Sequence, residues 1–536
     1  MIILGDFMEF ILNNVYLPLD MEEDQLPFVV CRMLGINYND IESYKVLKKS
    51  VDSRDKKKIT FVYSLLINLN RYYEKIKNNP NYRLKTYIEE IELPKCKSEK
   101  RPVVIGFGPC GMFASLLLAR AKLKPIVIER GKKVEDRLFD IKNFKEKGIL
   151  DENSNFCFGE GGAGTFSDGK LNTGISDNKI RFVLKELINH GAPEEIYYEG
   201  HPHIGSDKLI DVVKNIREEI ISLGGKILFE TEFIDYVEEE NVLKGIKIKS
   251  KNKESILECD DCILAIGHSA RDTFINLYNH NLVMKPKPFS LGVRIEHLQE
   301  DLDKCQYGKE YQNPKLPRSD YKQVVHLPNN RTVYTFCMCP GGEVVGTPTQ
   351  KESIVTNGMS YYKRDLVNCN AALLVNVKTE DYYINSPLDG MYFQEIIERA
   401  AFNIKEPYKA PCQKLSDFLL NQKSESFGKI KPSYKPGVYF KDLNEILPKF
   451  ISDSIKEALP ILEKKLKIFK DKDAIMTGVE TRSSSPISIP RDEEYSSSVK
   501  NLYPAGEGAS FAGGIMSSAL DGINVSLKII EKYKVE

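Results

Sequence analysis

Two short apolar runs in the first third of this 536-residue chain flank a glycine turn and an apolar helical pattern. The first run, 103–105, leads directly into the turn at 106–111, and the helical pattern continues to about residue 120. The second run, 126–128, ends at Glu129. This order predicts a strand, a turn, a helix and a second strand, which together make a β-α-β unit of a parallel sheet.

The glycine turn has the spacing Gly106-x-Gly108-x-x-Gly111. The first glycine permits a tight turn, the second lets the backbone approach a pyrophosphate, and the third lets the helix pack closely on the sheet. Pro109 suits the first turn of a helix, where free N–H groups and the helix dipole favour a phosphate. Glu129 follows at the place where a carboxylate accepts a hydrogen bond from a ribose. The stretch therefore predicts a dinucleotide site.

A second glycine-rich stretch, residues 155–170, is followed by neither a helical pattern nor a strand that ends in an acid. Gly159, Gly161 and Gly164 repeat the spacing of the first turn, but this context does not support a second nucleotide unit. We interpret the stretch as a loop whose backbone packs against a flat or charged group. A flexible surface loop is the alternative.

The C-terminal part of the chain offers further contacts to an extended ligand. One apolar strand ends at Gly267, and a later one ends in Gly-Glu-Gly at 506–508. Two glycines at 513–514 then open a closing helix predicted at about 517–532, whose N-terminus would face negative charge developing on a flavin ring. A nicotinamide dinucleotide needs neither contact, so these features favour FAD over NAD.

The first 98 residues form a separate pattern. It predicts the order strand, helix, strand, strand, helix, strand at residues 10–19, 24–34, 44–51, 59–69, 72–77 and 84–88. This order suggests a ferredoxin-like domain. A basic cluster in its central hairpin could touch a polyanion or could be a solvated flank: Lys48, Lys49, Arg54, Lys56, Lys57 and Lys58.

The pattern changes again between residues 285 and 472. Short alternating strands extend to about residue 377, and amphipathic helices follow, for example at 393–401 and 443–469. We expect an inserted substrate domain here. The predicted domains are a ferredoxin-like α+β domain at 1–98, a discontinuous three-layer Rossmann-like FAD-binding domain at 99–284 and 473–536, and a mixed α+β insertion at 285–472. The fold class is α/β.

Composition excludes several classes of function. The 76 basic side chains balance the 76 acidic ones, so no net field attracts a nucleic acid or an anionic membrane. The N-terminus has no basic region of a signal peptide, and no apolar stretch is long enough to span a bilayer. Eleven cysteines, an odd number, fit a reducing compartment better than a disulfide scaffold. We expect a cytoplasmic protein with no membrane partner, no resident metal, and nucleic acid unlikely as a ligand.

The chain resembles the uncharacterised FAD-dependent dehydrogenases, also called NAD(FAD)-utilising dehydrogenases, a group similar to the glutathione-reductase-like flavoprotein superfamily. The resemblance spans about residues 53–523. The stretches that carry it are VVIGFGPCGMFASL, NFCFGEGGAGTFSDGKL, AIGHSARDTF, KPFSLGVRIEH, FCMCPGGEVV, VTNGMSYYKRD, GVETRSSSPISI and LYPAGEGASFAGGIMSSALDGI.

The resemblance implies that FAD lies on the first glycine turn with Glu129, on the loop at 161–165, and on Glu507 with Gly514 and Ile515. It implies no particular substrate. Together with neighbouring positions, the predicted cofactor-binding residues are Gly106, Gly108, Pro109, Cys110, Gly111, Glu129, Arg130, Gly161, Gly162, Ala163, Gly164, Thr165, Gly267, Gly506, Glu507, Gly514 and Ile515.

Cys337 and Cys339 are separated by one residue in a predicted strand, whose alternation would put both on one face. Such residues lie about 6.6 Å apart, at the upper edge of the reach of a disulfide. An easy bridge between them is therefore doubtful. A thiol relay to the flavin and simple buried packing are both open interpretations.

Four charged or titratable residues are the other candidates for chemistry, and each has a structural alternative. Arg482 is the preferred candidate for polarising the substrate or the flavin. His268 could touch the flavin or act as an acid, or it could be a hydrogen-bonded turn residue. Arg294 could clamp an anionic group or pair with Glu296 across the sheet. Lys170 could stabilise a reduced flavin anion or pair with the nearby Asp168.

These features together predict an FAD-dependent oxidoreductase. It would pass hydride between NADH or NADPH, the flavin and a small organic substrate. A flavin monooxygenase is the enzymatic alternative. The non-enzymatic alternative is a flavin-stabilised binding protein that uses the basic N-terminal hairpin to hold RNA or a protein partner.

Overall fold

The computed structural model describes residues 2–4, 7–79, 82 and 88–535, and it divides into two compact units. The first unit combines residues 1–91 with two later segments, 176–203 and 300–319. The second unit combines residues 92–175, 204–299 and 320–536. Within the described ranges, no helix combines the length and apolar character that crossing a membrane requires.

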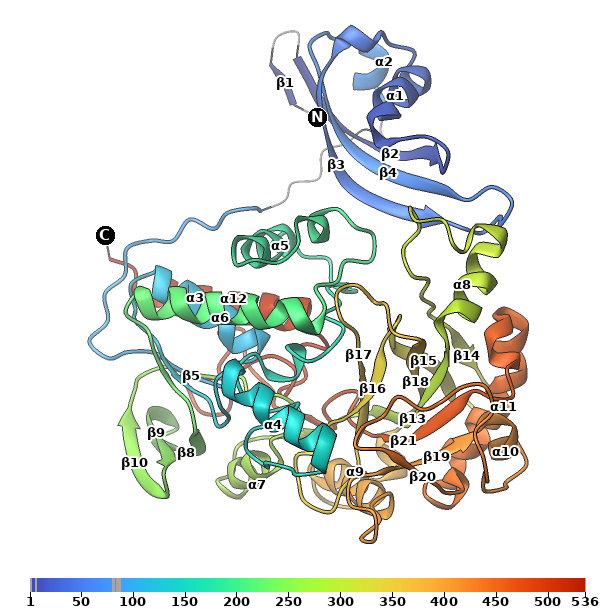
Figure 1. Cartoon of the computed structure of the whole chain (residues 1–536). Coiled ribbons are helices and arrows are strands. Elements are labelled where there is room, and N and C mark those ends of the chain that lie inside the picture. Colours follow the sequence, from blue (N-terminus) through green and yellow to red (C-terminus); the bar gives the residue numbers. More distant parts are fainter. Residues whose placement is uncertain (1, 5–6, 80–81, 83–87, 536) are drawn as a thin grey trace. The chain divides into compact units, whose positions relative to one another are not determined.

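The first unit is built on an antiparallel four-stranded sheet with the order β1-β2-β4-β3 (Figure 1). Its elements are β1 (Ile2–Leu4), β2 (Phe7–Pro18), α1 (Leu26–Leu34), β3 (Ile41–Asp52), β4 (Thr60–Leu69), α2 (Glu74–Lys77), α5 (Ile180–Asn189) and most of α8 (Gln299–Tyr307). Apolar side chains that alternate along β2 and β4 pack against α1 and α2 to form its core.

The order predicted for the N-terminal domain is confirmed up to its second helix. The strand predicted at 84–88 falls mostly on residues 83–87, which lie outside the described residues. The position beside β2 is filled instead by β1, where Ile2 pairs with Glu9. The hydrophobic pattern does not predict β1, because a three-residue strand carries too little periodicity to be recognised.

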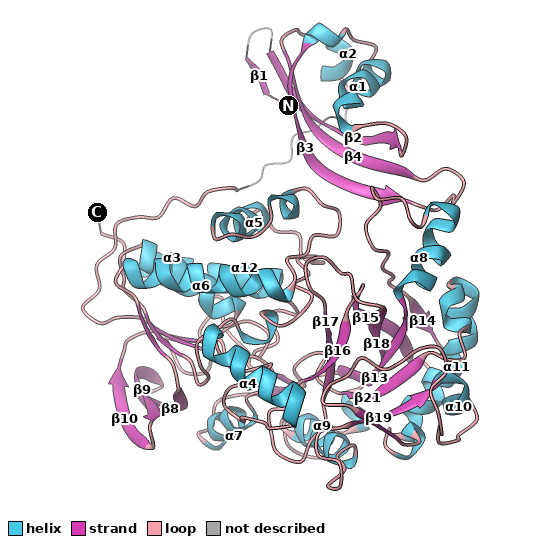
Figure 2. Ribbon diagram, viewed as in Figure 1, coloured by secondary structure: helices cyan, strands magenta, loops and turns pink. Residues whose placement is uncertain are grey.

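The second unit contains a parallel five-stranded sheet with the order β23-β11-β5-β6-β7. Figure 2 shows the strands of this unit in magenta and its helices in cyan. Its strands are β5 (Val103–Ile105), β6 (Ile126–Ile128), β7 (Lys226–Leu228), β11 (Cys262–Leu264) and β23 (Leu502–Pro504). On one face lie α3 (Pro109–Arg120), α6 (Ser206–Ser222) and α12 (Ile515–Lys532), which Figure 1 shows side by side. The strand from the far C-terminal segment thus completes the sheet begun at residue 103.

The other face of this parallel sheet is covered by an antiparallel meander and one helix. The meander consists of β8 (Thr231–Glu239), β9 (Val242–Ser250) and β10 (Lys253–Glu258), and the helix is α7 (Arg271–Asn279). Their apolar side chains form one core with alternate residues of the sheet strands. The arrangement has three layers, and α4 (Val134–Lys147) follows β6 in the chain.

The remaining part of the second unit is a seven-stranded sheet with the order β14-β15-β18-β13-β21-β19-β20. Its strands are β13 (Phe289–Leu298), β14 (Val324–His326), β15 (Thr332–Cys339), β18 (Asn368–Val377), β19 (Ala410–Lys414), β20 (Val438–Phe440) and β21 (Ile475–Glu480). It is antiparallel except for the pair β19 and β20. Because β21 lies between β13 and β19, this sheet reaches past residue 472.

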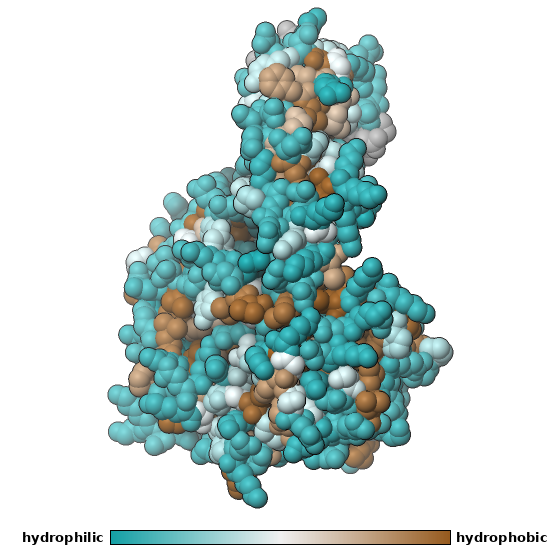
Figure 3. Space-filling view, turned by 45° about the vertical axis from the view of Figure 1, so that its right-hand side comes forward, coloured by the Kyte–Doolittle hydropathy of each residue, from teal (hydrophilic) through white to brown (hydrophobic). Residues whose placement is uncertain are grey.

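Shorter elements complete this part of the unit. They are β12 (Lys285–Pro286) with β22 (Ile487–Ser488), the hairpin β16 (Glu343–Gly346) with β17 (Thr356–Met359), and the helices α9 (Asp389–Ala400), α10 (Leu415–Leu419) and α11 (Lys449–Lys465). The surface in Figure 3 is mostly hydrophilic, and the hydrophobic residues on it form small separate patches.

Candidate functional site

The first glycine turn lies between β5 and α3, where side chains would not fit. A Cβ on Gly106, whose φ is 90°, would lie 2.3 Å from the carbonyl oxygen of Ala265. A Cβ on Gly111 would lie 1.9 Å from the carbonyl oxygen of Gly106. Gly108 precedes the helix and Pro109 begins it, so the helix end presents its first N–H groups outside the helix. Such an end favours an anion.

Glu129 is 5% exposed and ties three parts of this region together. Its Oε2 accepts a hydrogen bond from the N–H of Phe107, and its Oε1 accepts from Gly131 and Gly159, each at 2.9 Å. A carboxylate oxygen can accept two hydrogen bonds, so Oε2 keeps one lone pair for a ribose hydroxyl. Glu129 therefore has a structural task that the motif did not predict. Ribose binding stays a prediction.

The glycine loop at 155–170 is held rigidly, which argues against the flexible alternative. The fully buried Arg137 of α4 donates to four of its carbonyl oxygens at 2.6–2.9 Å: those of Asn155, Phe156, Glu160 and Gly162. Burial lowers the pKa of Arg137 to about 10, so it stays charged at neutral pH. Arg137 could not be singled out from the sequence, because nothing there distinguishes it from a surface arginine of an amphipathic helix.

Backbone contacts bring the glycine loop onto the first glycine turn. A Cβ on Gly162 would lie 3.0 Å from Gly108 Cα. A Cβ on Gly164 would lie 3.3 Å from Pro109 Cγ and 3.2 Å from Ile515 Cγ1 at the start of α12. Three segments that are remote in sequence therefore meet at the N-terminal ends of α3 and α12.

The C-terminal glycines join the same region. A Cβ on Gly506 would lie 3.0 Å from Cys110 Cβ, and one on Gly508 would lie 2.4 Å from the carbonyl oxygen of Gly267. Around Gly514, by contrast, no described atom lies within 4 Å of where a Cβ would be. The backbone at the start of α12 thus borders open space.

Two predicted cofactor residues form other contacts. Arg130 donates to both carboxylate oxygens of Asp272 at 3.0 and 2.9 Å, and its guanidinium lies 4.5 Å from the centre of the Phe158 ring. Thr165 is buried, and its hydroxyl donates to the carbonyl oxygen of Glu160. Both residues therefore support the walls of the region.

A hollow lies beside the glycine loop. Its lining includes residues predicted to bind the cofactor and residues predicted to take part in the chemistry. It is lined by Phe156, Cys157, Ala163, Phe166, Ser167, His268, Val345, Thr347, Val355, Thr356, Asn357, Gly358 and Arg482. Ala163 belongs to the predicted cofactor set, while His268 and Arg482 belong to the predicted chemical set. The structure thus places the glycine loop, the end of β11 and the hairpin β16–β17 around one space.

Arg482 is fixed by a buried carboxylate. Glu398 of α9 is fully buried and accepts two hydrogen bonds from Arg482, at 2.9 and 2.7 Å, and two from Arg271, at 2.9 and 2.8 Å. The third donor of Arg482 reaches the hydroxyl of Thr349. Burial disfavours the charge of Glu398, but the two arginines outweigh it and lower its pKa to about 2. Arg482 therefore reaches the hollow as part of a fixed charge cluster.

His268 lines the same hollow in a neutral state. Burial, followed by the charges of Arg482 and Arg271, lowers its pKa to about 4. Its Nδ1 lies 2.8 Å from the hydroxyl of Ser269. An imidazole with this pKa is neutral at pH 7, so His268 holds little of the imidazolium form that the predicted role as an acid would use. The alternative of a hydrogen-bonded turn residue fits these contacts.

Cys337 and Cys339 depart from the predicted regular alternation. Between Phe336 and Cys339, strand β15 has one residue more than its partner strand β18, which makes a β-bulge. Cys337 has a φ of 41°, in the left-handed region. The bulge interrupts the period of two on which that expectation rested, and the placement of both cysteines on one face stays a prediction. Cys339 is buried, Cys337 is half-buried, and both are free thiols.

Arg294 lies beneath these cysteines and is fully buried. It donates to the carbonyl oxygen of Cys337 at 2.9 Å, to Asn370 Oδ1 at 2.6 Å and to Glu480 at 3.2 Å. Glu296 instead accepts hydrogen bonds from Ser433 and Asn368, so the predicted ion pair between Arg294 and Glu296 is not the one that forms. Strand spacing alone could not show that Glu480, from β21, takes this place.

Lys170 pairs with Asp168 at 2.6 Å, which is the structural alternative given for it. Asp168 also accepts two hydrogen bonds from Arg364, at 3.0 and 2.5 Å. The charge of Lys170 acts on both Cys337 and Cys339. Lys170 and Arg294 thus provide positive charge near the thiol pair.

The charge of the Glu507 carboxylate is only partly balanced by a nearby positive charge. Burial raises its pKa to about 7, opposed by the charge of Lys287 and reinforced by that of Cys337. Lys287 responds in the opposite direction, since burial lowers its pKa. Glu507 therefore changes its charge near neutral pH, within electrostatic reach of the thiol pair.

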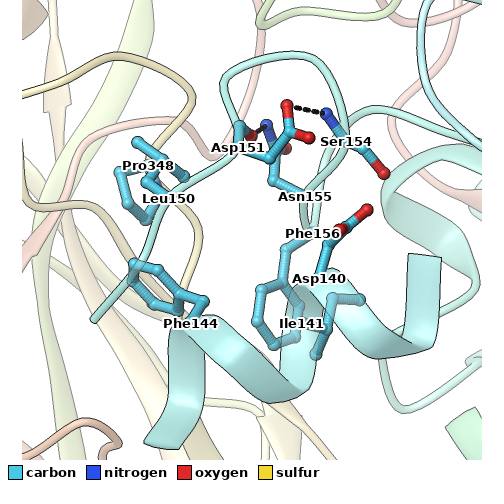
Figure 4. Close-up of a pocket in the computed structure, with 10 residues that line it drawn as sticks. Asp140, Ile141, Phe144, Leu150, Asp151, Ser154, Asn155, Phe156 and Pro348 are labelled. Carbon is cyan, nitrogen blue, oxygen red and sulfur yellow. Dashed lines mark hydrogen bonds between the residues drawn. The ribbon is translucent and has the colours of Figure 1, made fainter. Parts of the chain in front are cut away.

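A second hollow near the glycine loop is more apolar (Figure 4). It is lined by Asp140, Ile141, Phe144, Leu150, Asp151, Ser154, Asn155, Phe156, Gly346 and Pro348. Lys132 neutralises its two acids, at 2.8 Å from Asp140 and 3.3 Å from Asp151. The second hollow is lined by none of the predicted site residues. The hollow that His268 and Arg482 line is therefore the better candidate for chemistry.

Comparison with known proteins gives a relative of almost the same length. An uncharacterized protein of Clostridium beijerinckii (strain ATCC 51743 / NCIMB 8052) is 44% identical over 531 residues, which cover 97% of this chain and 98% of that protein. The chain belongs to the family of this protein. In the present chain, residues 288–483 match the domain described as "FAD-dependent protein, C-terminal domain-like", and residues 11–68 match a domain of unknown function.

Several solved structures are similar to this chain at low sequence identity. The flavin-dependent brominase Bmp2 is 12% identical with a TM-score of 0.37, covering 81% of this chain and 79% of that one. CtdE in complex with FAD is 12% identical with a TM-score of 0.32, covering 80% and 84%. A geranylgeranyl bacteriochlorophyll reductase-like protein of Thermoplasma acidophilum is 11% identical with a TM-score of 0.33, covering 81% and 79%.

Proposed function

We propose that this chain is an FAD-dependent oxidoreductase that binds its cofactor where the three glycine segments meet. The meeting of Gly162 with Gly108, and of Gly164 with Pro109 and Ile515, carries the proposal. Such close contacts favour glycine, and they bring the glycine loop to the N-terminal ends of α3 and α12, where backbone N–H groups favour an anion. The description of the matched domain as part of an FAD-dependent protein supports the same cofactor.

The residues present fit FAD. The N–H groups at the start of α3 suit the pyrophosphate, and the free lone pair of Glu129 Oε2 suits a ribose hydroxyl. The open space around Gly514 leaves room beside the start of α12. When bound, FAD supplies two-electron redox chemistry. The chain's own part is to hold the cofactor and to exclude water from it.

The reaction we propose takes hydride from NADH or NADPH to a small organic substrate. The hollow beside the glycine loop is the proposed place for the substrate, since it is lined by Ala163 of the cofactor set. Arg482, held by Glu398, would keep a positive charge at its wall. Neutral His268 could orient a substrate through a hydrogen bond.

The test is the visible spectrum of the purified protein and the bleaching of its flavin bands by NADH and NADPH without oxygen. Gly164→Val should lower the flavin content at least about tenfold, because its side chain would enter the contact with Pro109 and Ile515. Gly174→Ala is the matched control, since no described atom lies within 4 Å of its Cβ position. A colourless wild-type protein that takes up no added FAD would refute the proposal.

A further inference from the structure

The hollow beside the glycine loop has a lining that suits a negatively charged ligand. Among the described residues that line it, Arg482 carries a positive charge and none is an aspartate or a glutamate. His268, which is neutral, adds no charge of its own. A small anion in this hollow would therefore meet one guanidinium and no carboxylate of the lining.

Arg482 has donors to offer such an anion. It is 5% exposed, its Nε and Nη2 donate to Glu398, and its Nη1 donates to the hydroxyl of Thr349. A guanidinium has five N–H groups, so one further N–H on Nη1 and one on Nη2 remain after these three hydrogen bonds. Two donors on neighbouring nitrogens of a planar group suit the two oxygens of a carboxylate.

The charge cluster behind Arg482 is incomplete without an anion. Glu398 also pairs with Arg271 at 2.8 Å, so one carboxylate serves two guanidinium groups and one positive charge is in excess. Glu395 acts on both arginines as well, but its own partner is Arg399, at 2.8 Å. Because an excess charge in a buried cluster costs free energy, an anion bound at Arg482 would complete the cluster.

A second, independent observation concerns Thr356 of β17, which lines the same hollow. This residue is 1% exposed, and its hydroxyl has no hydrogen-bond partner within the described part of the chain. Buried hydroxyls nearly always have a partner, and each exception calls for an explanation. An oxygen of a ligand in the hollow would accept the hydrogen bond that the fold leaves unused.

The size of the hollow limits what it can hold. Its free volume is about 30 Å³. This is room for about two water molecules, so a carboxylate fits and a ring does not. Apolar side chains from the glycine loop and from the hairpin β16–β17 also line it: Phe156, Phe166, Val345 and Val355. The hollow thus suits a carboxylate that is attached to a short apolar chain.

We propose that this hollow binds the carboxylate of a short-chain organic acid, with Arg482 and Thr356 as its hydrogen-bond donors. This names a substrate class for the oxidoreductase proposed above, and turnover of the acid rests on that function. Binding itself needs only the hollow. Ala163 of the glycine loop belongs to the same lining, which places the acid beside the predicted cofactor residues.

The experiment measures the binding of propionate to the full-length protein by saturation-transfer NMR. Propionamide has nearly the same shape without the charge, so propionate should bind at least about tenfold more tightly. Nitrate is a planar anion without a carbon chain, and it should displace propionate only at severalfold higher concentration. Equal binding of propionate and propionamide, or nitrate as strong a ligand as propionate, would overturn the proposal.

Variants locate the site. Arg482→Gln should lower the affinity for propionate at least about tenfold, because the charge-assisted hydrogen bonds are lost. Thr356→Val keeps the shape of the side chain and should lower the affinity about two- to tenfold. It should not lower the midpoint of thermal unfolding, since the hydroxyl has no partner in the described fold. A structural role for this hydroxyl would instead lower that midpoint.

Thr477→Val is the matched control. Thr477 is also buried with a hydroxyl that has no partner among the described residues, but it does not line the hollow. Its variant should bind propionate as the wild-type protein does. Wild-type affinity in Thr356→Val, which tests the site even where Arg482→Gln does not fold, would overturn the proposal. An equal loss of affinity in Thr477→Val would overturn it as well.

The flavin spectrum of the same sample keeps the two proposals apart. A colourless protein that binds propionate through Arg482 and Thr356 refutes only the flavin proposal. A yellow protein that binds no propionate refutes only the carboxylate site. Displacement of propionate by added FAD would assign the hollow to the cofactor and overturn the substrate class.

Discussion

The two sheets of the second unit build their parts of the site in opposite ways. Around the parallel sheet, the site consists mainly of backbone, brought close by glycines such as Gly111 and Gly162 that leave no room for a side chain. Around the seven-stranded sheet, it consists of buried charges such as Arg294 and Glu398. A glycine contact is encoded locally by one residue. A buried charge depends on a partner that another segment supplies.

This difference sets the cost of losing a residue in each region. Adding a methyl group at a close backbone contact costs about 1–3 kcal/mol, because neighbouring elements shift to relieve it. Removing one partner of a buried ion pair costs about 3–5 kcal/mol, because a charge stays behind without water. A single substitution should therefore lower the free energy of unfolding more around the seven-stranded sheet than around the parallel sheet.

The largest effect is expected for Glu398→Gln. The substitution removes the charge that two buried arginines share, so the free energy of unfolding in urea should fall by about 3–5 kcal/mol. Glu395→Gln, on the same helix, removes a partly exposed pair with Arg399 and should cost less than about 1 kcal/mol. Equal losses in the two variants would contradict the distinction between the regions.

The loss in Glu398→Gln should also depend on pH. The folded pKa of Glu398 is about 2, below that of an unfolded glutamate. Its contribution is therefore complete above about pH 4.3 and disappears as the pH falls towards 2. Unfolding curves of the two proteins should converge over this range.

Glu507→Gln should have the opposite dependence on pH. Its raised pKa of about 7 means that the folded protein prefers the protonated form, so its cost appears as the pH rises from about 4.3 to 7. The variant should be more stable than the wild-type protein at pH 8 by at most about 4 kcal/mol. The two should be similar at pH 4, as urea unfolding at both values would measure. A constant difference would show that Glu507 does not titrate in this range.

Gly111→Ala tests the parallel-sheet region. The new Cβ would meet the carbonyl oxygen of Gly106, so we expect a loss of about 1–3 kcal/mol and a lower flavin content. Thermal unfolding and the visible spectrum measure the two effects. Gly174→Ala should change neither, and a fully loaded, stable Gly111→Ala protein would remove the glycine turn from the site.

The smallest effect is expected for the combined charge reversal of Lys56, Lys57 and Lys58 to Glu. These side chains are exposed in the first unit, so unfolding should change by less than about 0.5 kcal/mol. The flavin spectrum should also remain the same. A loss of RNA or protein binding in pull-down experiments would instead support the alternative that this hairpin holds a partner.

The sequence allowed the glycine region to be predicted because its signal is contiguous. Gly106, Gly108 and Gly111 lie in six successive residues with a strand before them and a helix after them, and the structure places them accordingly. Even there, the backbone hydrogen bonds of Glu129 were missed, because they join residues 107, 131 and 159.

The charge clusters could not be predicted in the same way. Glu398 forms ion pairs with Arg271 and Arg482. The three residues come from three segments that lie more than 80 residues apart in the chain, so no local spacing in the sequence indicates the cluster. For Arg294 the residue was singled out but its partner was not. At Cys337 the pattern indicated a regular strand, whereas the bulge appears only when β15 is paired with β18.

The outer edge of the N-terminal sheet has one more consequence. Strand β3 pairs with β4 on one side, and on its other side Lys49 exchanges backbone hydrogen bonds with Tyr198 and Gly200. A polypeptide ending at residue 98 would lack that cover and present bare donors and acceptors along β3. Such an edge recruits strands from neighbouring molecules, so the shortened protein should self-associate more strongly than the full chain.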